Sequence, residues 1–469
     1  MSTMLRLSEI TTALNGRLLG TDAAFDAVST DSRAIRAGDL FVALRGERFD
    51  GHEFVAAVGN DGAVGAVVDE AAAPALQAAG LPLVVVADTR LALGALAAFW
   101  RARFALPLIA VTGSNGKTTT KEMIAAILAA HFGDAVLATQ GNFNNDIGLP
   151  LTLLKLGEQH RAAIIEMGMN HPGEIGYLTR IARPTVALVT NAQRAHLEGM
   201  GSLDAIAVEK GTIYDGLDAK GVAVVNADDA HAVLWREKNS GRRVVDFAID
   251  ADAEVRGKVR LHGLDNELHL VAPQGEAIID LALPGLHNAR NALAAAAATL
   301  AAGLPFAAVV AGLSAFRGVK GRLQRRAGMN GAVVLDDTYN ANPDSVRAGI
   351  DVLAATIGRK ILVLGDMGEI GEAGGQLHDE IGGYAKSAGI DALYALGESS
   401  AIAARNFGAG ATHFRKFEDL VDALKPQLAV DVTVLVKGSR FMRMERVADA
   451  IAVAPAAAAM PFPEIKQCS

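Results

Sequence analysis

The chain has 469 residues, a formal net charge of −8 and an apolar fraction of 51%, which describe a globular protein too long for a single hydrophobic core. The length predicts about three domains. The acidic balance argues against a non-specific nucleic-acid binder, although a local Lys/Arg pocket could still hold an anionic small molecule. The single cysteine, Cys468, excludes an intramolecular disulfide, and no uninterrupted apolar run reaches the roughly 18 residues that span a membrane. We therefore expect a cytoplasmic protein.

Residues 1–104 predict a small α/β domain followed by a linker helix. Apolar runs at 40–44, 66–69 and 83–87 are typical of buried strands, and residues 88–100 predict the helix. One turn combines hydroxyls, a carboxylate and a guanidinium, a set that can bind a nucleotide base or a diphosphate (Ser29, Asp31, Ser32, Arg33). A second polar turn surrounds His52. An ordinary capping turn is the alternative interpretation of both clusters.

The stretch 108–128 predicts a buried strand, a glycine turn and a helix, and the rest of the chain is organised around it. The glycines permit close backbone approach to a phosphate, Lys117 can reach the terminal phosphates, and the Thr118 hydroxyl can face Mg²⁺. Val111 stands where the commoner, longer loop has its first glycine. A glycine turn with a solvated lysine is the alternative, but the combination favours a nucleoside triphosphate site made of Gly113, Ser114, Asn115, Gly116, Lys117, Thr118 and Thr119.

Residues 105–322 alternate strands and helices and predict a mostly parallel sheet. Glu166 ends the strand at 162–168, and His196 follows the strand at 186–190. Because ligands gather at the carboxyl ends of parallel strands, Thr118, Glu166 and His196 could converge on a metal beside the phosphates, with Lys210 after the same edge. A surface histidine would be the default interpretation of His196 alone. The alternating pattern of residues 243–283 predicts an antiparallel edge ribbon.

Two amide-rich segments are further candidates. Asn142, Asn144 and Asn145 lie in the segment 139–150, where ligand contacts and a self-bonded loop are equal alternatives. His287, Asn288 and Asn291 begin a helix at which a planar base could stack, with simple capping as the alternative.

Residues 323–455 predict a Rossmann-like domain of four strands with intervening helices, and residues 456–469 a tail. The first strand delivers Asp336 and Asp337 into a loop. It is not followed by a phosphate-binding glycine loop, so dinucleotide binding is not expected.

These motifs, in this order, resemble the Mur ligases of peptidoglycan precursor synthesis over essentially the whole chain. The shared central set is 112–119, Glu166-Met-Gly168, Asn191-x4-His196, Lys210-Gly211 and 285–291, which alone would also admit folylpolyglutamate-type ligases. The segments 139–150, 336–345 and 364–371, with 31–33 and 41–46, resemble the branch of the family that adds D-alanyl-D-alanine. The Asp-Asn-Pro-Arg motif of the branch that adds the third residue does not occur in the sequence.

The resemblance implies an ATP-dependent amide-bond ligase that acts on UDP-N-acetylmuramoyl-tripeptide and D-alanyl-D-alanine through an acyl phosphate, and so serves cell-wall biogenesis, cell shape and cell division. It implies two Mg²⁺ ions, the first held by Thr118 and Glu166 and the second by His196. An ammonium cannot ligate Mg²⁺, so Lys210 is expected as the carbamate that the family carries there.

The resemblance also assigns further residues. ATP would be held by the glycine loop, by His287, Asn288 and Asn291, and by Asp337, Tyr339 and Asn340. Arg322 would be catalytic when the C-terminal domain closes. The reacting end would meet Lys437, Ser439 and Arg440, for which a solvated strand exit is the alternative. The UDP portion would meet Ser29, Asp31, Ser32, Arg33, Gly46 and His52, and the muramoyl-peptide Asn142, Asn144 and Asn145.

We expect a monomer that binds neither nucleic acid nor a membrane. The rival interpretations are a P-loop switch or motor, a nucleotide-binding scaffold without catalysis, and a neighbouring ligase with another acceptor or amino acid.

Overall fold

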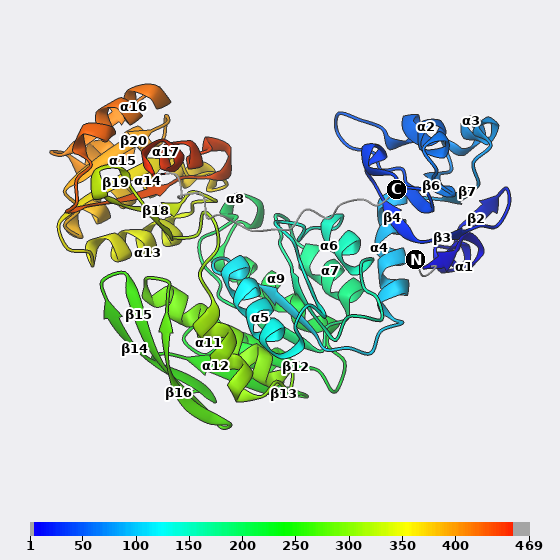
Figure 1. The fold of residues 1–469 in the computed structure, drawn as a ribbon, viewed down its shortest axis with the longest axis horizontal. Coiled ribbons are helices and arrows are strands. Elements are labelled where there is room, and N and C mark those ends of the chain that lie inside the picture. The colour runs from blue at the N-terminus through cyan, green and yellow to red at the C-terminus, as the bar shows by residue number, and fades with distance from the viewer. Residues whose placement is uncertain (1–3, 454–469) are drawn as a thin grey trace, which may run out of the picture. The chain divides into compact units, whose positions relative to one another are not determined.

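The computed structural model of the protein describes residues 4–453 and shows the predicted mixed α/β fold (Figure 1). It divides into two compact units, Met1–Ala282 with Leu286–Arg317, and Leu283–Gly285 with Gly318–Ser469. The predicted tail at 456–469 and Cys468 lie outside the described residues. Within residues 4–453, no helix has both the length and the apolar character needed to cross a bilayer.

The first unit begins with a five-stranded sheet in the order β2-β7-β6-β5-β4. Strands β4 (Ala27–Ser29), β5 (Asp39–Val42), β6 (Gly65–Asp69) and β7 (Leu83–Val86) run parallel, and β2 (Arg17–Leu19) is antiparallel to β7. Helices α1 (Leu7–Ala13), α2 (Val55–Asn60) and α3 (Ala73–Leu76) accompany the sheet. Helix α4 (Thr89–Arg101) follows, with Asp88 as its N-cap, which confirms the helix predicted at 88–100.

A nine-stranded sheet forms the centre of the first unit, in the order β16-β15-β14-β13-β12-β11-β8-β10-β9. Strand β8 (Leu108–Thr112) pairs in parallel with β10 (Ala162–Glu166) on one side and β11 (Val186–Val189) on the other. Beyond them lie β9 (Val136–Ala138) and β12 (Val222–Asn226), also parallel to their neighbours. Every residue of β8 is buried, as expected of a parallel strand that is covered on both faces.

The central sheet is accompanied by two groups of helices. Helices α5 (Lys117–Phe132), α11 (Leu286–Ala301) and α12 (Phe306–Ala315) pack against one another, and α4 packs with α6 (Gly148–Leu153) and α7 (Glu174–Ala182). Helix α9 (Leu203–Gly211) packs against α7 and against α10 (Ala232–Lys238). The alanine run of α11 is almost wholly buried, so small side chains allow this helix to lie close to α5 and the sheet.

The predicted antiparallel ribbon at 243–283 is only partly correct. Strand β13 (Arg243–Ala248) runs parallel to β12 and continues the parallel sheet. Only β14 (Val255–His262), β15 (Asp265–Ala272) and β16 (Gly275–Leu281) form the antiparallel edge. A half-covered parallel strand near a sheet edge has the same apolar-polar alternation as an antiparallel one, so the pattern does not separate them.

The second unit contains a six-stranded sheet in the order β17-β18-β22-β19-β20-β21. The predicted four strands are β18 (Val333–Asp337), β19 (Arg359–Gly365), β20 (Ala392–Leu396) and β22 (Val432–Lys437). The prediction missed β21 (Ala411–Phe414), a parallel edge strand, and β17 (Gln324–Ala327), which pairs antiparallel with β18. Helices α13 (Pro343–Ala354), α14 (Gly374–Ser387), α15 (Ser400–Phe407), α16 (Phe417–Leu424) and α17 (Glu445–Ile451) complete the unit.

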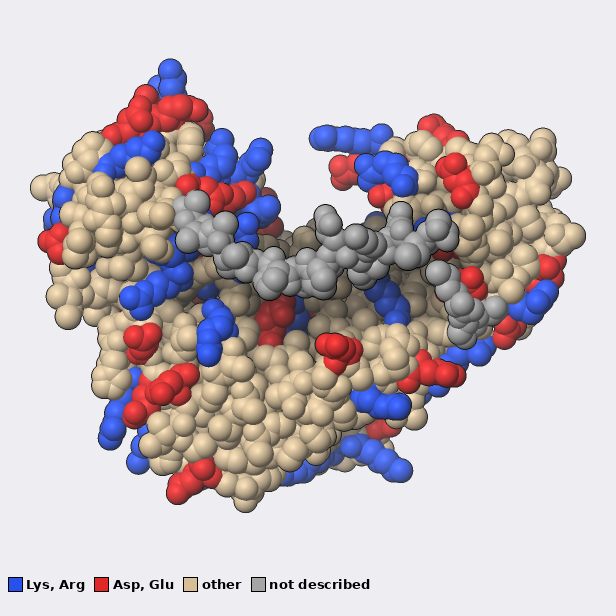
Figure 2. All heavy atoms as spheres, in the orientation of Figure 1, with Lys and Arg blue, Asp and Glu red and all other residues tan. Residues whose placement is uncertain are grey.

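Acidic and basic side chains lie side by side over the described residues of both units on the face drawn in Figure 2. Such a mixed surface is ordinary for a protein of modest net negative charge.

Candidate active site

The loop between β8 and α5 has the geometry of a phosphate-binding turn. Gly116 is the N-cap of α5 in a left-handed conformation (φ 80°), and a Cβ at this position would lie 2.2 Å from the Asn291 Oδ1 atom. The residue must therefore be glycine. The Lys117 ammonium donates to the carbonyl oxygens of Gly113 (2.6 Å) and Ser114 (3.2 Å), which folds the side chain back over the loop. The loop thus combines a helix N-terminus, a glycine in the left-handed conformation and a cation.

The turn that follows β11 holds the glycine loop in place. The Asn115 N–H donates to Asn191 Oδ1 (2.9 Å), and the Asn115 amide nitrogen donates to Gln193 Oε1 (2.7 Å). The Ser114 hydroxyl donates to the Gln193 carbonyl (2.9 Å), while the Thr190 hydroxyl donates to the Asn115 carbonyl (2.7 Å). These contacts fix the backbone of the loop before any ligand binds.

Glu166 ends β10 as predicted, and its carboxylate is only half satisfied. The side chain is 2% exposed, and its Oε1 atom accepts from the Asn144 amide (2.8 Å). The Oε2 atom is buried and has no hydrogen-bond partner among the described residues. A buried charged oxygen without a partner costs stability, so this atom fits a cation ligand.

Lys210 lies on α9, where its side chain is 1% exposed. Burial lowers the pKa of Lys210 well below its ordinary value of 10.5, and the positive charge of Lys117 lowers it further, against a raising effect of Glu209. The influence of Lys117 shows that the structure brings the two predicted lysines to the same region. A lowered pKa makes the neutral, nucleophilic amine easier to reach, and this is the form that reacts with CO₂.

His196 is the N-cap of the short helix α8 (Leu197–Met200) and has a left-handed backbone (φ 59°). Non-glycine residues in this region are uncommon and cluster at functional sites. Within residues 4–453, no three His, Cys, Asp or Glu side chains gather closely enough to hold a metal ion on their own. A cation here would need additional oxygen ligands, such as phosphates, the Thr118 hydroxyl or a lysine carbamate.

The start of α11 lies against the glycine loop, because the side chain of Asn291 contacts the position of Gly116. The Asn291 amide nitrogen donates to Asn288 Oδ1 (3.2 Å), and both side chains are buried. His287 precedes them and is half-buried. The predicted base-binding residues are thus next to the predicted phosphate loop.

In the second unit, the predicted residues at the ends of β18 and β22 form one polar cluster. The Lys437 ammonium lies 2.5 Å from Asp337 Oδ2 and donates to the Asn340 carbonyl (3.0 Å). Burial lowers the pKa of Lys437, with a smaller contribution from Arg322, while Asp337 raises it. The Ser439 hydroxyl accepts from the Gly368 N–H (2.7 Å) and donates to the Ala341 carbonyl (3.1 Å). A solvated strand exit is therefore wrong for Lys437 and Ser439.

Tyr339 is flanked by two guanidinium groups. Arg322 lies over its ring at 4.1 Å from the centroid and Arg440 at 5.8 Å. The Arg440 side chain is 65% exposed. Two cations beside an aromatic ring suit an anionic or planar ligand.

The N-terminal cluster is a capping turn at the rim of a cavity. Asp31 caps the 3-10 turn Ser32–Ala34, and a hydrogen bond from Arg33 lowers the pKa of Asp31 to about 2. Ser29 and Asp31 line a cavity of about 1310 Å³ together with Trp100 and Phe143. Trp100 packs against the hydrophobic core, lines this cavity and donates its indole N–H to the Leu156 carbonyl (3.0 Å).

His52 and Gly46 shape the second polar turn of the N-terminal domain. The imidazole of His52 is 5% exposed, with Nδ1 2.6 Å from Asp50 Oδ1 and Nε2 accepting from the Asp69 N–H (3.1 Å). Both ring nitrogens are thus engaged inside the domain. A Cβ at Gly46 would lie 2.5 Å from the ring of Phe49, which is 60% exposed. Phe49 is thus an exposed aromatic side chain of this turn, whereas His52 is buried.

The three asparagines of 139–150 have different environments. Asn144 bonds to Glu166, whereas the Asn145 Oδ1 atom accepts from the Gly148 N–H (2.8 Å) at the start of α6. The Asn142 carbonyl accepts from the Asn144 N–H (2.7 Å). These contacts show that the loop is self-bonded and that Asn144 reaches the carboxylate of Glu166, whereas the expected ligand contacts stay a prediction.

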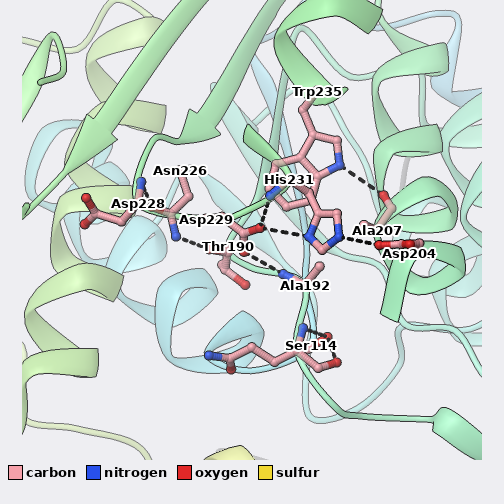
Figure 3. Close-up of polar contacts among 11 residues, drawn as sticks. Ser114, Thr190, Ala192, Asp204, Ala207, Asn226, Asp228, Asp229, His231 and Trp235 are labelled. Atoms are coloured by element: carbon pink, nitrogen blue, oxygen red, sulfur yellow. Dashed lines mark hydrogen bonds and ion pairs between the residues drawn. The ribbon is translucent and has the colours of Figure 1, made fainter. Parts of the chain in front are cut away.

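Sequence reasoning missed several residues that support the loop, chiefly Thr190, Asn191, Gln193, Asn226 and Asp229. Asn226 donates to the Thr190 carbonyl (2.8 Å), and Asp229 Oδ2 accepts from the Ala192 N–H (2.9 Å), as Figure 3 shows. The sequence did show a cluster of polar residues just after β12, at Asn226, Asp228 and Asp229. This strand pairs with β11, which precedes His196.

A glycine turn at a helix N-terminus, with a strand-end carboxylate whose second oxygen has no partner among the described residues, is typical of a P-loop nucleotide-binding protein. Sequence comparison agrees over three segments, which match the Mur ligase family catalytic domain (24–101), the Mur ligase middle domain (111–299) and the Mur ligase glutamate ligase domain (321–440). The chain belongs to the Mur ligase family.

Individual relatives cover nearly the whole chain. The UDP-N-acetylmuramoyl-tripeptide–D-alanyl-D-alanine ligase of Escherichia coli K12 is 42% identical over 449 residues, which are 95% of this chain and 98% of the relative. The crystal structure of MurF from Acinetobacter baumannii has a TM-score of 0.88 at 35% identity, covering 96% of this chain and 99% of that one. MurF from Thermotoga maritima, solved in complex with ADP, has a TM-score of 0.79 at 26% identity, with 90% and 96% covered.

Proposed function

We propose that the protein is the ATP-dependent ligase that joins D-alanyl-D-alanine to UDP-N-acetylmuramoyl-tripeptide in peptidoglycan precursor synthesis. The observation that carries this proposal is sequence identity above 40%, over 95% of the chain, to UDP-N-acetylmuramoyl-tripeptide–D-alanyl-D-alanine ligases of two bacteria. The ADP complex of a structural relative supports the use of ATP.

In the proposed reaction, the tripeptide carboxylate attacks the γ-phosphate of ATP, and the amine of the dipeptide then attacks the acyl phosphate and expels phosphate. The first step brings two anions together, so the site must offset their repulsion. Lys117 moves from the loop carbonyls to the β- and γ-phosphates, and the N–H groups at the start of α5 bind the same oxygens. His287, Asn288 and Asn291 bind the adenine end.

The residues present fit Mg²⁺. Thr118 and Glu166 would hold one ion through a hydroxyl and the unpartnered Oε2 atom, and His196 would hold a second. Mg²⁺, when bound, neutralises charge on the transferring phosphoryl group. Lys210 in its amine form is the group that CO₂ would carbamylate, and the resulting anion would join His196 at the second ion.

The remaining predicted residues receive roles by the same resemblance. Asp337, Tyr339, Asn340 and Arg322 contribute to ATP, whereas Lys437, Ser439 and Arg440 contribute to the reacting end of the substrates. The cavity at Ser29 and Asp31 receives part of the UDP-linked substrate, and Asn144 orients its peptide end beside Glu166. The turns at the two ends of the bound substrate shape its binding site. At the UDP end these turns contain Ser32, Arg33, Gly46 and His52, and at the peptide end Asn142 and Asn145.

The domain boundaries that accompany this proposal are 1–104 for the UDP substrate, 105–322 for ATP and 323–455 for the incoming dipeptide. We also propose that the enzyme works as a cytoplasmic monomer without nucleic-acid or membrane partners. Gel filtration with light scattering checks the oligomeric state.

Phosphate release tests the function. The purified protein is assayed with ATP, Mg²⁺ and UDP-N-acetylmuramoyl-tripeptide that carries either diaminopimelate or lysine, together with D-alanyl-D-alanine, single amino acids or folates. We expect release with D-alanyl-D-alanine alone, and a product whose mass equals that of the two substrates minus water. Release with a single amino acid in place of the dipeptide, or with a folate in place of the UDP-linked tripeptide, would overturn the assignment.

A further inference from the structure

The turn that follows β12 contacts segments beside both ends of the proposed nucleotide site. The reaction described above assigns this turn no role. The strand ends at Asn226, and Asp228 and Asp229 follow in the next turn. The two aspartate side chains are almost fully buried, at 8% and 6% exposure. Buried carboxylates are rare unless they are paired or hydrogen-bonded, so each partner of this pair is informative.

Asp229 is directed toward the phosphate end. Its Oδ2 atom accepts from the Ala192 N–H (2.9 Å), and its Oδ1 atom accepts from the His231 N–H (2.9 Å) (Figure 3). Ala192 lies between Asn191 and Gln193, the two residues that bond to the glycine loop. Through this one hydrogen bond, Asp229 fixes the turn that shapes the phosphate-binding backbone.

The contacts of Asp229 continue through His231 to α9, the helix that carries Lys210. The His231 ring lies between two carboxylates, with Nδ1 3.3 Å from Asp229 and Nε2 3.0 Å from Asp204 at the start of α9. The Trp235 indole N–H donates to the Ala207 carbonyl of the same helix (3.0 Å). Figure 3 shows this line of contacts from the turn at Ala192 to α9.

Asp228 is directed toward the adenine end. Its Oδ2 atom accepts from the Ile249 N–H (2.8 Å), and its Oδ1 atom accepts from the N–H groups of Asp250 (3.1 Å) and Ala251 (2.8 Å). The Oδ2 atom also lies 3.6 Å from the Arg290 Nε atom, and Arg290 pairs with Asp250 at 2.9 Å. Arg290 lies on α11 between Asn288 and Asn291, the proposed adenine contacts.

We propose that Asp228 and Asp229 are positioning residues that act on opposite ends of the bound nucleotide. Asp228 orients the start of α11 and thereby the adenine contacts, whereas Asp229 orients the turn at Ala192 and thereby the phosphate loop. The inference rests on the ATP site of the proposed function. It adds that one aspartate acts on the adenine end of that site and the other on the phosphate end.

Asparagine is the informative substitution at both positions. Each carboxylate uses both oxygens as acceptors from backbone N–H groups, and an amide offers one acceptor and one donor. Asp229→Asn must therefore place an NH₂ group against either Ala192 or His231, and Asp228→Asn must do the same against the 249–251 backbone. Loss of one hydrogen bond to a charged group is expected to change affinity by about tenfold.

The test compares both variants with Asp246→Asn as the matched control. Asp246 is a partly buried aspartate in the neighbouring strand β13, and it pairs with Arg236 of helix α10 (3.1 Å). Displacement of labelled ADP by inorganic tripolyphosphate and by adenosine measures the two ends separately, and neither probe requires ligase turnover. A failure of the proposed amide chemistry would thus leave this readout intact.

We expect Asp229→Asn to lose about tenfold in affinity for tripolyphosphate and to keep adenosine binding, and Asp228→Asn to show the reverse. In the ligase assay the first should lower kcat and the second should raise the KM for ATP. Equal losses for both probes in both variants, or lower melting temperatures with unchanged binding, would overturn the division. If Asp229→Asn does not fold, Asp229→Ser, which keeps one acceptor oxygen, is judged by the same criteria.

Discussion

Replacement of Glu166 by glutamine should make the ligand-free protein slightly more stable and the enzyme nearly inactive. Glutamine has the same shape and keeps the acceptor that binds the Asn144 amide. It removes the charge from the Oε2 atom, which is buried without a partner among the described residues. An unpartnered buried polar atom costs roughly 1–3 kcal/mol, and more when it is charged. Because the glutamine NH₂ group is also unpartnered, we expect a net gain of about 1 kcal/mol.

The loss of activity follows from the same oxygen. If Oε2 ligates Mg²⁺ at the transferring phosphate, its removal should cost on the order of 3 kcal/mol in the transition state, roughly a hundredfold in kcat. Melting curves should show a small rise of the ligand-free midpoint, and Mg²⁺ should no longer add to the stabilisation by ADP. Phosphate release measures the fall in kcat.

Glu174→Gln is the control for this experiment. The Glu174 Oε2 atom accepts from the N–H groups of Asn170 (2.6 Å) and His171 (3.0 Å), and its side chain is 42% exposed. Glutamine can keep that acceptor, so stability and Mg²⁺ response should stay near those of the unmodified protein. Normal turnover of Glu166→Gln with a full Mg²⁺ response would refute the assignment of Oε2 to a cation.

Three further outcomes are expected. Lys117→Ala should lower kcat about a hundredfold, on the order of 3 kcal/mol, and normal turnover in a phosphate-release assay would exclude the phosphate role. For Lys210, the folded state holds the proton less tightly than the unfolded chain, so the unfolding free energy without CO₂ should rise with pH toward 10.5. Denaturant melts from neutral to alkaline pH measure this slope, which Lys210→Met should lack, and bicarbonate should restore activity to a CO₂-depleted enzyme. Asp31→Ala should raise the KM for the UDP substrate and leave that for ATP unchanged; since Arg33 lowers the pKa of Asp31 to about 2, its charge should not vary with pH in the assay range.

The features that the sequence predicted well depend on local pattern. The strand, turn and helix at 108–128 are adjacent in the chain, so a single stretch specifies them, and the rule that parallel strands align their carboxyl ends placed Glu166 at the right edge. Lys210 and Asn291 were also found in this way, and the structure brings both close to the glycine loop.

The features that sequence reasoning missed depend on contacts between distant segments. The hydrogen bonds from Asn191 and Gln193 to the loop cross about 78 positions in the chain, and no local period reports them. Strands β17 and β21 have four residues each at the edges of the second sheet, and their half-exposed patterns resemble loops. The hydrogen bond from the Asp69 N–H to the His52 ring also joins separate segments, and the expected contact of His52 with the UDP portion stays a prediction.

Glu166 and Lys210 show why this site favours ligands over its own internal pairing. Both side chains are buried and could carry opposite charges, yet no hydrogen bond or ion pair joins them in residues 4–453. Burial of each without the other is unfavourable in the ligand-free protein, and under the proposed function the cost would be recovered when cations meet Glu166 and a carbamate replaces the amine of Lys210. A direct Glu166–Lys210 pair would be more stable, but it would occupy the oxygen that Mg²⁺ needs and protonate the amine that CO₂ needs. The arrangement therefore gives up stability at the position where phosphoryl transfer requires unpaired groups.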